Sequence, residues 1–291
     1  MDQKRGIDGF GAAALIGCAS ILAFNQIVIK VTGDGFAPLF QAGLRSVGAT
    51  VFLLIWMRAR GLNITPPPGT LYWGILSGVF FSLEFIGIYI ALDLTTVSRA
   101  SILLYSMPVW VALGGHFLLP GERLTPMRMA GLALALGGVA LAVADRSSGK
   151  PSVAGDLLAL GAAQAWAAIA LMVRVTPMRR MRPESQLLCQ VVVSALALLA
   201  LAPLFGPLLR DPQPVHYAGL AFQAIVVVGL AYLIWFWLMT IYQANSVASF
   251  SFLSPVLAVL FGWLILGETI GPPIWGALAL VAVGITLINR R

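Results

Sequence analysis

Apolar runs long enough to cross a lipid bilayer follow one another along the whole chain. There are ten of them: residues 8–31, 36–59, 70–93, 96–119, 125–145, 153–175, 183–205, 215–241, 246–266 and 272–289. A helix needs about 20 mostly apolar residues to cross a hydrocarbon core of about 30 Å. The runs do not alternate at every second residue, as strands of a membrane β-barrel would. We therefore expect an all-α polytopic membrane protein with ten transmembrane helices and no soluble domain.

Composition agrees with this fold class. Of the 291 residues 59% are hydrophobic and only 10% are charged, whereas a soluble domain carries about 25% charged residues. The first run has no small-residue cleavage site behind it, so we read it as a retained anchor and not as a signal peptide. The connections between runs are short and rich in Pro, Gly, Asp and Arg, which suits tight helical hairpins.

Basic residues predict the orientation, since Lys and Arg concentrate on the cytoplasmic side of a membrane. With both termini cytoplasmic, the inner side carries twelve of them and the outer side five; Arg45 lies inside the membrane. The inner set is Lys4, Arg5, Arg58, Arg60, Arg123, Arg128, Arg174, Arg179, Arg180, Arg182, Arg290 and Arg291, and the outer set is Lys30, Arg99, Arg146, Lys150 and Arg210. This loop bias explains the net charge of +7. We expect no nucleic-acid partner, because no basic patch interleaved with aromatic residues is present.

The second half of the chain repeats the first. At an offset of 146, nine residues meet identical ones: Leu118, Gly121, Glu122, Pro126, Leu132, Ala133, Leu134, Gly138 and Leu141 match Leu264, Gly267, Glu268, Pro272, Leu278, Ala279, Leu280, Gly284 and Leu287. Small shifts in register also bring Pro108 over Pro255. We therefore expect two five-helix units, residues 1–146 and 147–291. Because five is odd, the second unit enters the membrane from the opposite side, and such inverted repeats are typical of secondary transporters.

A proline interrupts the same run in each half. A proline inside a helix removes one backbone hydrogen bond and clashes with the preceding turn, and in lipid such breaks are placed against protein or a water-filled cavity. We interpret Pro108 and Pro255 as hinges that line a central cavity; a static kink is the alternative. A Gly-Glu pair ends the run in each half, with Glu122 and Glu268. We expect the glycines to terminate the helices and the two glutamates to have a structural role, not a role in binding or transport chemistry.

Two five-helix halves, each with a mid-helix proline and a closing Gly-Glu, resemble the EamA-type members of the drug/metabolite transporter superfamily. The segment 98–108, SRASILLYSMP, is also similar to that of aromatic amino-acid exporters of the YddG type. The resemblance implies a ten-helix fold in a bacterial inner membrane that exports amino acids or related small metabolites. Two features depart from the family pattern: Pro120 replaces the usual leucine before the first Gly-Glu, and the first helix lacks a central tryptophan.

Two ionisable residues lie deep in the apolar runs, where charged side chains are functional candidates by default. Arg45 and Glu84 each lie about nine residues from the outer end of their helices, which is ~13 Å at 1.5 Å per residue. They could form an ion pair or face one aqueous cavity. The resemblance favours a structural charge for Arg45. For Glu84, a role in the cavity and a role as partner of Arg45 are equally supported.

At the equivalent positions of the second half the repeat has neutral polar residues: Tyr232 aligns with Glu84, and Gln190 aligns with Arg45. This asymmetry would let a zwitterion bind in one orientation, with its amine towards Glu84. Aromatic side chains could stack on a substrate or hold a cation, although lipid-facing packing explains each of them equally simply. The candidate substrate-binding residues are Glu84, Tyr232, Trp166, Gln164, Tyr89, Tyr105, Trp110 and Asn25.

The leading hypothesis is a secondary transporter that exports neutral, aromatic or large apolar amino acids by alternating access. An exporter of cationic drugs or of another small metabolite is the alternative within the class. A membrane-embedded enzyme is disfavoured, because the chain lacks HExxH, an Asp-rich metal motif and a Gly-x-Ser-x-Gly elbow. No P-loop is present, so ATP does not drive transport from this chain and no ATP-binding subunit is implied. We expect no cofactor and no metal site, since His116 and His216 fall far apart in this topology.

Overall fold

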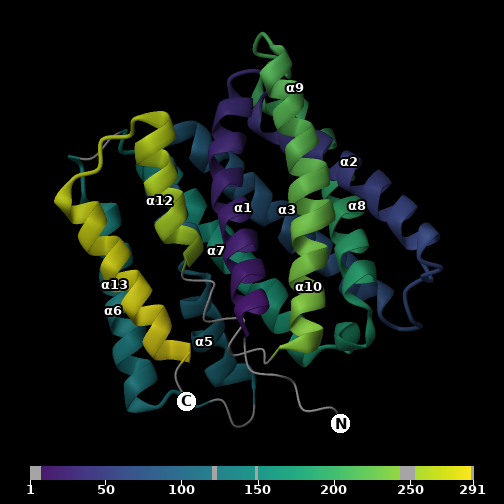
Figure 1. The fold of residues 1–291 in the computed structure, drawn as a ribbon, viewed down its shortest axis with the longest axis horizontal. Coiled ribbons are helices and arrows are strands. Elements are labelled where there is room, and N and C mark those ends of the chain that lie inside the picture. The colour runs from purple at the N-terminus through teal and green to yellow at the C-terminus, as the bar shows by residue number, and fades with distance from the viewer. Residues whose placement is uncertain (1–7, 120–122, 148–149, 243–252, 290–291) are drawn as a thin grey trace.

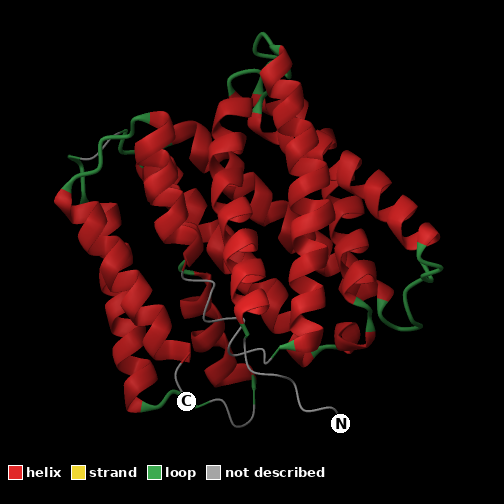
Figure 2. Cartoon of the chain, in the orientation of Figure 1, coloured by secondary structure: helices red, strands yellow, loops and turns green. Residues whose placement is uncertain are grey.

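The structure is a computed structural model, and it describes residues 8–119, 123–147, 150–242 and 253–289. These residues form a bundle of helices without strands (Figures 1 and 2). The helices are α1 (Gly9–Gly33), α2 (Pro38–Ala59), α3 (Leu71–Leu94), α4 (Val97–Leu104), α5 (Met107–Leu118), α6 (Pro126–Ala144), α7 (Val153–Val175), η1 (Pro177–Arg180), α8 (Pro183–Leu201), η2 (Ala202–Phe205), α9 (Pro214–Ala221), the π-helix η3 (Phe222–Ala231), α10 (Tyr232–Ile241), α12 (Leu253–Leu266) and α13 (Pro272–Asn289).

The all-α membrane class is confirmed for the described residues. Eight helical segments are long and apolar enough to span a bilayer, and two shorter apolar helices, α12 and α13, follow them. These ten segments coincide with the ten expected runs to within a few residues. The first part of the ninth run, residues 246–252, lies outside the described residues.

Local sequence explains where the helices begin. Proline occupies the first turn of α2, α6, α8 and α9, where its missing N–H costs no intrahelical bond and its fixed φ suits the helix. The side chains of Thr96, Thr125 and Ser152 accept hydrogen bonds from the first turns of α4, α6 and α7. Such N-caps satisfy donors that the helix itself leaves unpaired. The boundaries therefore follow from proline and hydroxyl residues between the apolar runs.

The bundle exposes an apolar surface of the kind that lipid covers. Val47, Val51 and Ile55 follow one another at intervals of four on α2, and all three are exposed. Residues at this spacing lie on one face of a helix. Similar exposed apolar side chains continue on α3, at Ile75 and Leu83. A large contiguous apolar surface on a soluble monomer would be unusual, so we place these faces against the hydrocarbon of a membrane.

Helix–helix packing joins elements that are distant in the sequence (Figure 1). α6 packs along α13, α3 along α7, α2 along α8, and α1 along α12 and along the α9–η3–α10 segment. We call the end of the bundle where α1 and α3 terminate the distal end, and the opposite end, where α1 begins, the proximal end. At the distal end an isolated bridge joins Phe36 to Leu209.

Pro108 interrupts its helix as expected. α4 ends at Leu104 and α5 begins at Met107, with Pro108 in its first turn. The Ser106 hydroxyl donates to the carbonyl oxygen of Leu103 (2.6 Å), which compensates in part for the broken ladder. Pro255 is the third residue of α12 and is buried; the residues before Leu253 lie outside the described part. Whether the two prolines act as hinges is a separate question that stays a prediction.

Candidate functional site

Buried polar atoms without a hydrogen-bond partner gather on α1–α4. They are Asn25 Oδ1, Gln26 Oε1, Arg45 Nε and Nη2, Glu84 Oε2 and Ser101 Oγ. We call these five residues the central polar cluster. In native proteins nearly all buried polar groups are paired, and each exception requires an explanation such as a bound ligand, ion or water. Unpaired donors and acceptors on four neighbouring helices therefore mark a candidate binding site.

Arg45 is held by aromatic rings and not by a carboxylate. It is only 1% exposed, and its guanidinium carbon lies 3.8 Å from the centroid of the Phe85 ring and 5.7 Å from that of Phe81. A cation over an aromatic face is attracted to the ring by its quadrupole. Stacking of this kind orients the guanidinium while leaving Nε and Nη2 free to donate.

Glu84 lies close enough to Arg45 to interact electrostatically, but the two residues form no salt bridge within the described part of the chain. The sequence allowed either a direct ion pair between Arg45 and Glu84 or two charges that face one aqueous cavity. The direct ion pair is not observed. The Tyr232 hydroxyl is in electrostatic range of both charges and of the Tyr89 and Tyr105 hydroxyls. Glu84, Tyr232, Tyr89 and Tyr105 are predicted substrate-binding residues, and the fold brings them together around Arg45.

Three of the predicted aromatic residues, Tyr105, Trp110 and Trp166, lie at the break between α4 and α5. The Tyr105 and Trp166 rings meet edge to face, with centroids 6.0 Å apart. The indole N–H of Trp110 donates to the Ser106 hydroxyl (3.2 Å). Tyr105 also lies beside Gln26 and Ser254, so the residues before Pro108 and Pro255 approach each other. The break in one half thus contacts the corresponding part of the other half.

Not every predicted residue is enclosed. Asn25 and Glu84 are buried, and Trp166, Trp110 and Tyr232 are half-buried. Gln164 is exposed and does not belong to the central polar cluster. Gln190, which aligns with Arg45 in the repeat, is 8% exposed.

A buried hydrogen-bond network centred on Gln223 was missed in the sequence. Gln223 is fully buried, and its Oε1 accepts from the Tyr89 hydroxyl (2.6 Å) and from Gln41 Nε2 (3.5 Å). Its Nε2 donates to Thr32 Oγ1 (3.4 Å). Gln223 lies in the first turn of the π-helix η3, and π-helical segments are frequent at functional sites. The available signal was a lone glutamine in an otherwise apolar run.

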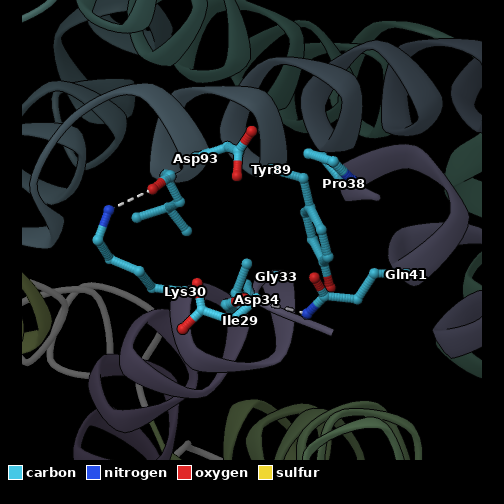
Figure 3. Close-up of a pocket in the computed structure, with 9 residues that line it drawn as sticks. Ile29, Lys30, Gly33, Asp34, Pro38, Gln41, Tyr89 and Asp93 are labelled. Atoms are coloured by element: carbon cyan, nitrogen blue, oxygen red, sulfur yellow. Dashed lines mark hydrogen bonds between the residues drawn. The ribbon is translucent and has the colours of Figure 1, made fainter. Parts of the chain in front are cut away.

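Beside this network lies a polar pocket of about 60 Å³. It is lined by Ile29, Lys30, Gly33, Asp34, Pro38, Gln41, Tyr89, Leu92 and Asp93. Tyr89 and Gln41 lie on one side of it and Lys30 on the opposite side (Figure 3). The lining residues come from the distal parts of α1, α2 and α3 and from Asp34, which follows α1, so we call it the distal pocket.

The turn between α3 and α4 is capped by charges from other helices. Lys30 Nζ donates to the carbonyl oxygens of Leu92 (2.6 Å) and Thr95 (2.7 Å) at the end of α3. Glu268 accepts from the N–H groups of Val97 (2.6 Å) and Ser98 (3.0 Å) and from the Ser98 hydroxyl (2.6 Å) at the start of α4. A cation at a helix C-terminus and an anion at an N-terminus both complement the helix dipole. Glu268 thus has a structural role, as expected, but as a cap on another helix.

Two further ion pairs lie at the distal end. Arg99, expected on the outer side, is buried and bonds to Asp156 through Nη2 (2.6 Å) and Nε (3.3 Å). Arg210 bonds to Asp93 through both terminal nitrogens (2.6 and 3.1 Å). The hydrogen bond with Asp93 raises the pKa of the Arg210 guanidinium. Arg210 therefore joins the loop before α9 to the end of α3.

Comparison with known proteins identifies the family. The chain is similar over 96% of its length to "Aromatic amino acid exporter YddG" of Ancylobacter novellus (28% identity, 99% of that protein). It is similar over 94% to "Probable amino-acid metabolite efflux pump" of Salmonella typhimurium (29% identity, 92% of that protein). "Uncharacterized transporter YoaV" of Bacillus subtilis is 25% identical over 88% of both chains. A solved protein structure, 24% identical, has the same fold, with a TM-score of 0.66 over 95% of this chain and 96% of the other. The model of the EamA-like transporter family matches residues 9–144 and again residues 153–290, so the chain belongs to this family.

Proposed function

We propose that the protein is a secondary transporter that exports neutral amino acids with aromatic or large apolar side chains, and that the central polar cluster binds the substrate. The observation that carries the proposal is a buried guanidinium near a buried carboxyl group with which it forms no salt bridge. Each group therefore keeps hydrogen-bonding atoms without a partner: Nε and Nη2 of Arg45, and Oε2 of Glu84. An amino acid carries both complementary charges. Its carboxylate would bind Arg45 and its ammonium group Glu84.

The cost of leaving charges unpaired in a membrane supports this assignment. A single charged side chain at the centre of a bilayer costs at least ~2.5–3.5 kcal/mol on insertion scales. A zwitterionic substrate would satisfy both residues at once, while water would do so between transport cycles. The rings of Tyr105, Trp166 and Tyr232 would contact an apolar or aromatic substrate side chain. Two relatives, named as an aromatic amino-acid exporter and a probable amino-acid metabolite efflux pump, agree with this substrate class.

Alternating access between two inverted halves, residues 1–146 and 147–291, is the proposed mechanism. Pro108 and Pro255 would act as hinges, and the contact of Tyr105 with Ser254 would couple them across the halves. We place the protein in a bacterial inner membrane with both termini in the cytoplasm and the distal end outside. This orientation rests on the twelve-to-five distribution of basic residues.

Counterflow into liposomes that contain only this protein tests the proposal. We expect saturable, protein-dependent exchange of radiolabelled phenylalanine, inhibited by tryptophan and leucine. Phenethylamine, which lacks the carboxylate, and 3-phenylpropionate, which lacks the amine, should each compete at least tenfold more weakly, because each loses a charge-assisted hydrogen bond of about 1.5–3 kcal/mol. Liposomes without protein are the control. If phenethylamine competed as well as phenylalanine, the protein would be an exporter of cations that uses Glu84 alone.

A further inference from the structure

The hydrogen bond between Tyr89 and Gln223 occupies the boundary between two polar regions. On its distal side is the distal pocket, which Tyr89 and Gln41 line. On its other side Tyr89 interacts with Arg45 of the central polar cluster, and Tyr232 is in electrostatic range of both. Tyr89 is only 1% exposed and Gln223 is fully buried. Tyr89 thus contacts the distal pocket and the central polar cluster, and its hydrogen bond to Gln223 lies between these two regions.

The pair also joins the two halves of the chain. Tyr89, Gln41 and Thr32 belong to the first half, and Gln223 belongs to the second. Of the three hydrogen bonds at the Gln223 amide, only the one from Tyr89 is short, at 2.6 Å. Those with Gln41 and Thr32 measure 3.5 and 3.4 Å, at or beyond the upper limit of ordinary hydrogen-bond lengths. Contact between the halves at this amide thus depends mainly on one hydrogen bond.

We propose that the Tyr89–Gln223 hydrogen bond is the distal gate of the substrate path, and that the distal pocket beyond it receives the charged head group of the departing substrate. A volume of about 60 Å³ admits a few waters or an amino-acid head group, but not an aromatic ring. The pocket is lined by the carboxylates of Asp34 and Asp93 and by the ammonium group of Lys30. Lys30 already donates to two carbonyl oxygens and Asp93 already pairs with Arg210. Because an ammonium group has three donors and a carboxylate about four acceptor sites, both can still bind one end of a zwitterion. The assignment of a substrate rests on the proposed function; the gate itself does not.

The gate is tested by the accessibility of a cysteine placed beneath it. Asn25 is one helical turn before the pocket-lining Ile29 on the same face of α1, and it is buried. In a protein with Cys18 and Cys189 replaced by alanine, Asn25→Cys is labelled with a membrane-impermeant methanethiosulfonate, in intact cells and in inverted vesicles. Tyr89→Phe and Gln223→Leu should each raise the labelling rate from the distal side by about two- to tenfold, the population change expected for loss of one net hydrogen bond. The double variant should label no faster than the faster single one.

Matched variants separate gating from general loosening. Tyr72→Phe removes a hydroxyl from an exposed tyrosine on the same helix and should leave the rate unchanged. Thr32→Val removes only the longer bond at the same amide (3.4 Å) and should label like the parent, with both proteins eluting as monodisperse peaks on size exclusion. Unchanged labelling from both sides in Tyr89→Phe and Gln223→Leu would overturn the gate, as would a Thr32→Val protein that labels as fast as Gln223→Leu. Because labelling needs no substrate, the gate and the amino-acid assignment fail independently.

Discussion

At the scale of single residues, substitutions of Arg45 and Glu84 show whether Glu84 binds the substrate or only neutralises Arg45. If Glu84 served only to neutralise Arg45, the two would be expected in direct contact, and they form no salt bridge. We therefore predict that Glu84→Gln leaves the melting temperature in detergent nearly unchanged and weakens phenylalanine counterflow by about 10- to 100-fold, the loss of one charge-assisted hydrogen bond. Glu184→Gln, at the start of α8, is the matched control and should transport normally.

Arg45→Gln provides the second arm of this experiment. A structural pair predicts that Glu84→Gln lowers the melting temperature and that adding Arg45→Gln restores it, because no uncompensated charge is left. Such a rescue would contradict a binding role for Glu84. Normal transport by a stable Glu84→Gln protein would remove the residue from the site altogether.

At the scale of secondary-structure elements, the start of α4 depends on a carboxylate from another helix. α12 ends at Leu266 and is followed by Gly267, whose φ of 64° favours glycine. The next residue, Glu268, caps α4. A Cβ added at Gly262 would lie 2.7 Å from Glu268 Oε2. Gly262→Ala should therefore displace the cap and lower the melting temperature, although alanine is favoured over glycine inside a helix by about 1 kcal/mol. The control Gly137→Ala, on α6 with open space around it, should not destabilise the protein. Equal effects of the two substitutions would contradict the role of the cap.

Elements and their contacts differ in how far sequence predicts them. The helix boundaries were predictable to within a few residues, because apolar runs, prolines and hydroxyl caps are local signals. The break at Pro108 follows from the same chemistry. The cap by Glu268 and the network at Gln223 were not predictable, because they join residues 170 and 134 positions apart. The sequence brought Glu84, Arg45, Tyr89, Tyr105 and Tyr232 under consideration, but only the packing shows that the two charges lie apart.

At the scale of the whole molecule, the packing of α6 on α13 supports the proposed two-fold relation between the halves. A Cβ at Gly131 would meet the carbonyl oxygen of Gly284, and a Cβ at Gly138 would meet that of Ala277, both at 2.7 Å. At the offset of 146, Gly131 is equivalent to position 277 and Gly138 to position 284. The repeat therefore converts each of the two contacts into the other. Such exchange is what an axis in the membrane plane requires of an inverted repeat, and it lets the halves swap conformations.

The orientation in the membrane is a property of the whole molecule, because it depends on the distribution of basic residues along the entire chain. The loop at Asn63 lies between α2 and α3 at the proximal end. Lys150 precedes α7 at the distal end, where its carbonyl oxygen accepts from Thr95 Oγ1. Because basic residues favour a cytoplasmic proximal end, we predict that an impermeant maleimide labels Lys150→Cys in intact cells and labels Asn63→Cys only in inverted vesicles. Labelling of Asn63→Cys from outside intact cells would reverse the orientation, and with it the direction in which the distal gate opens.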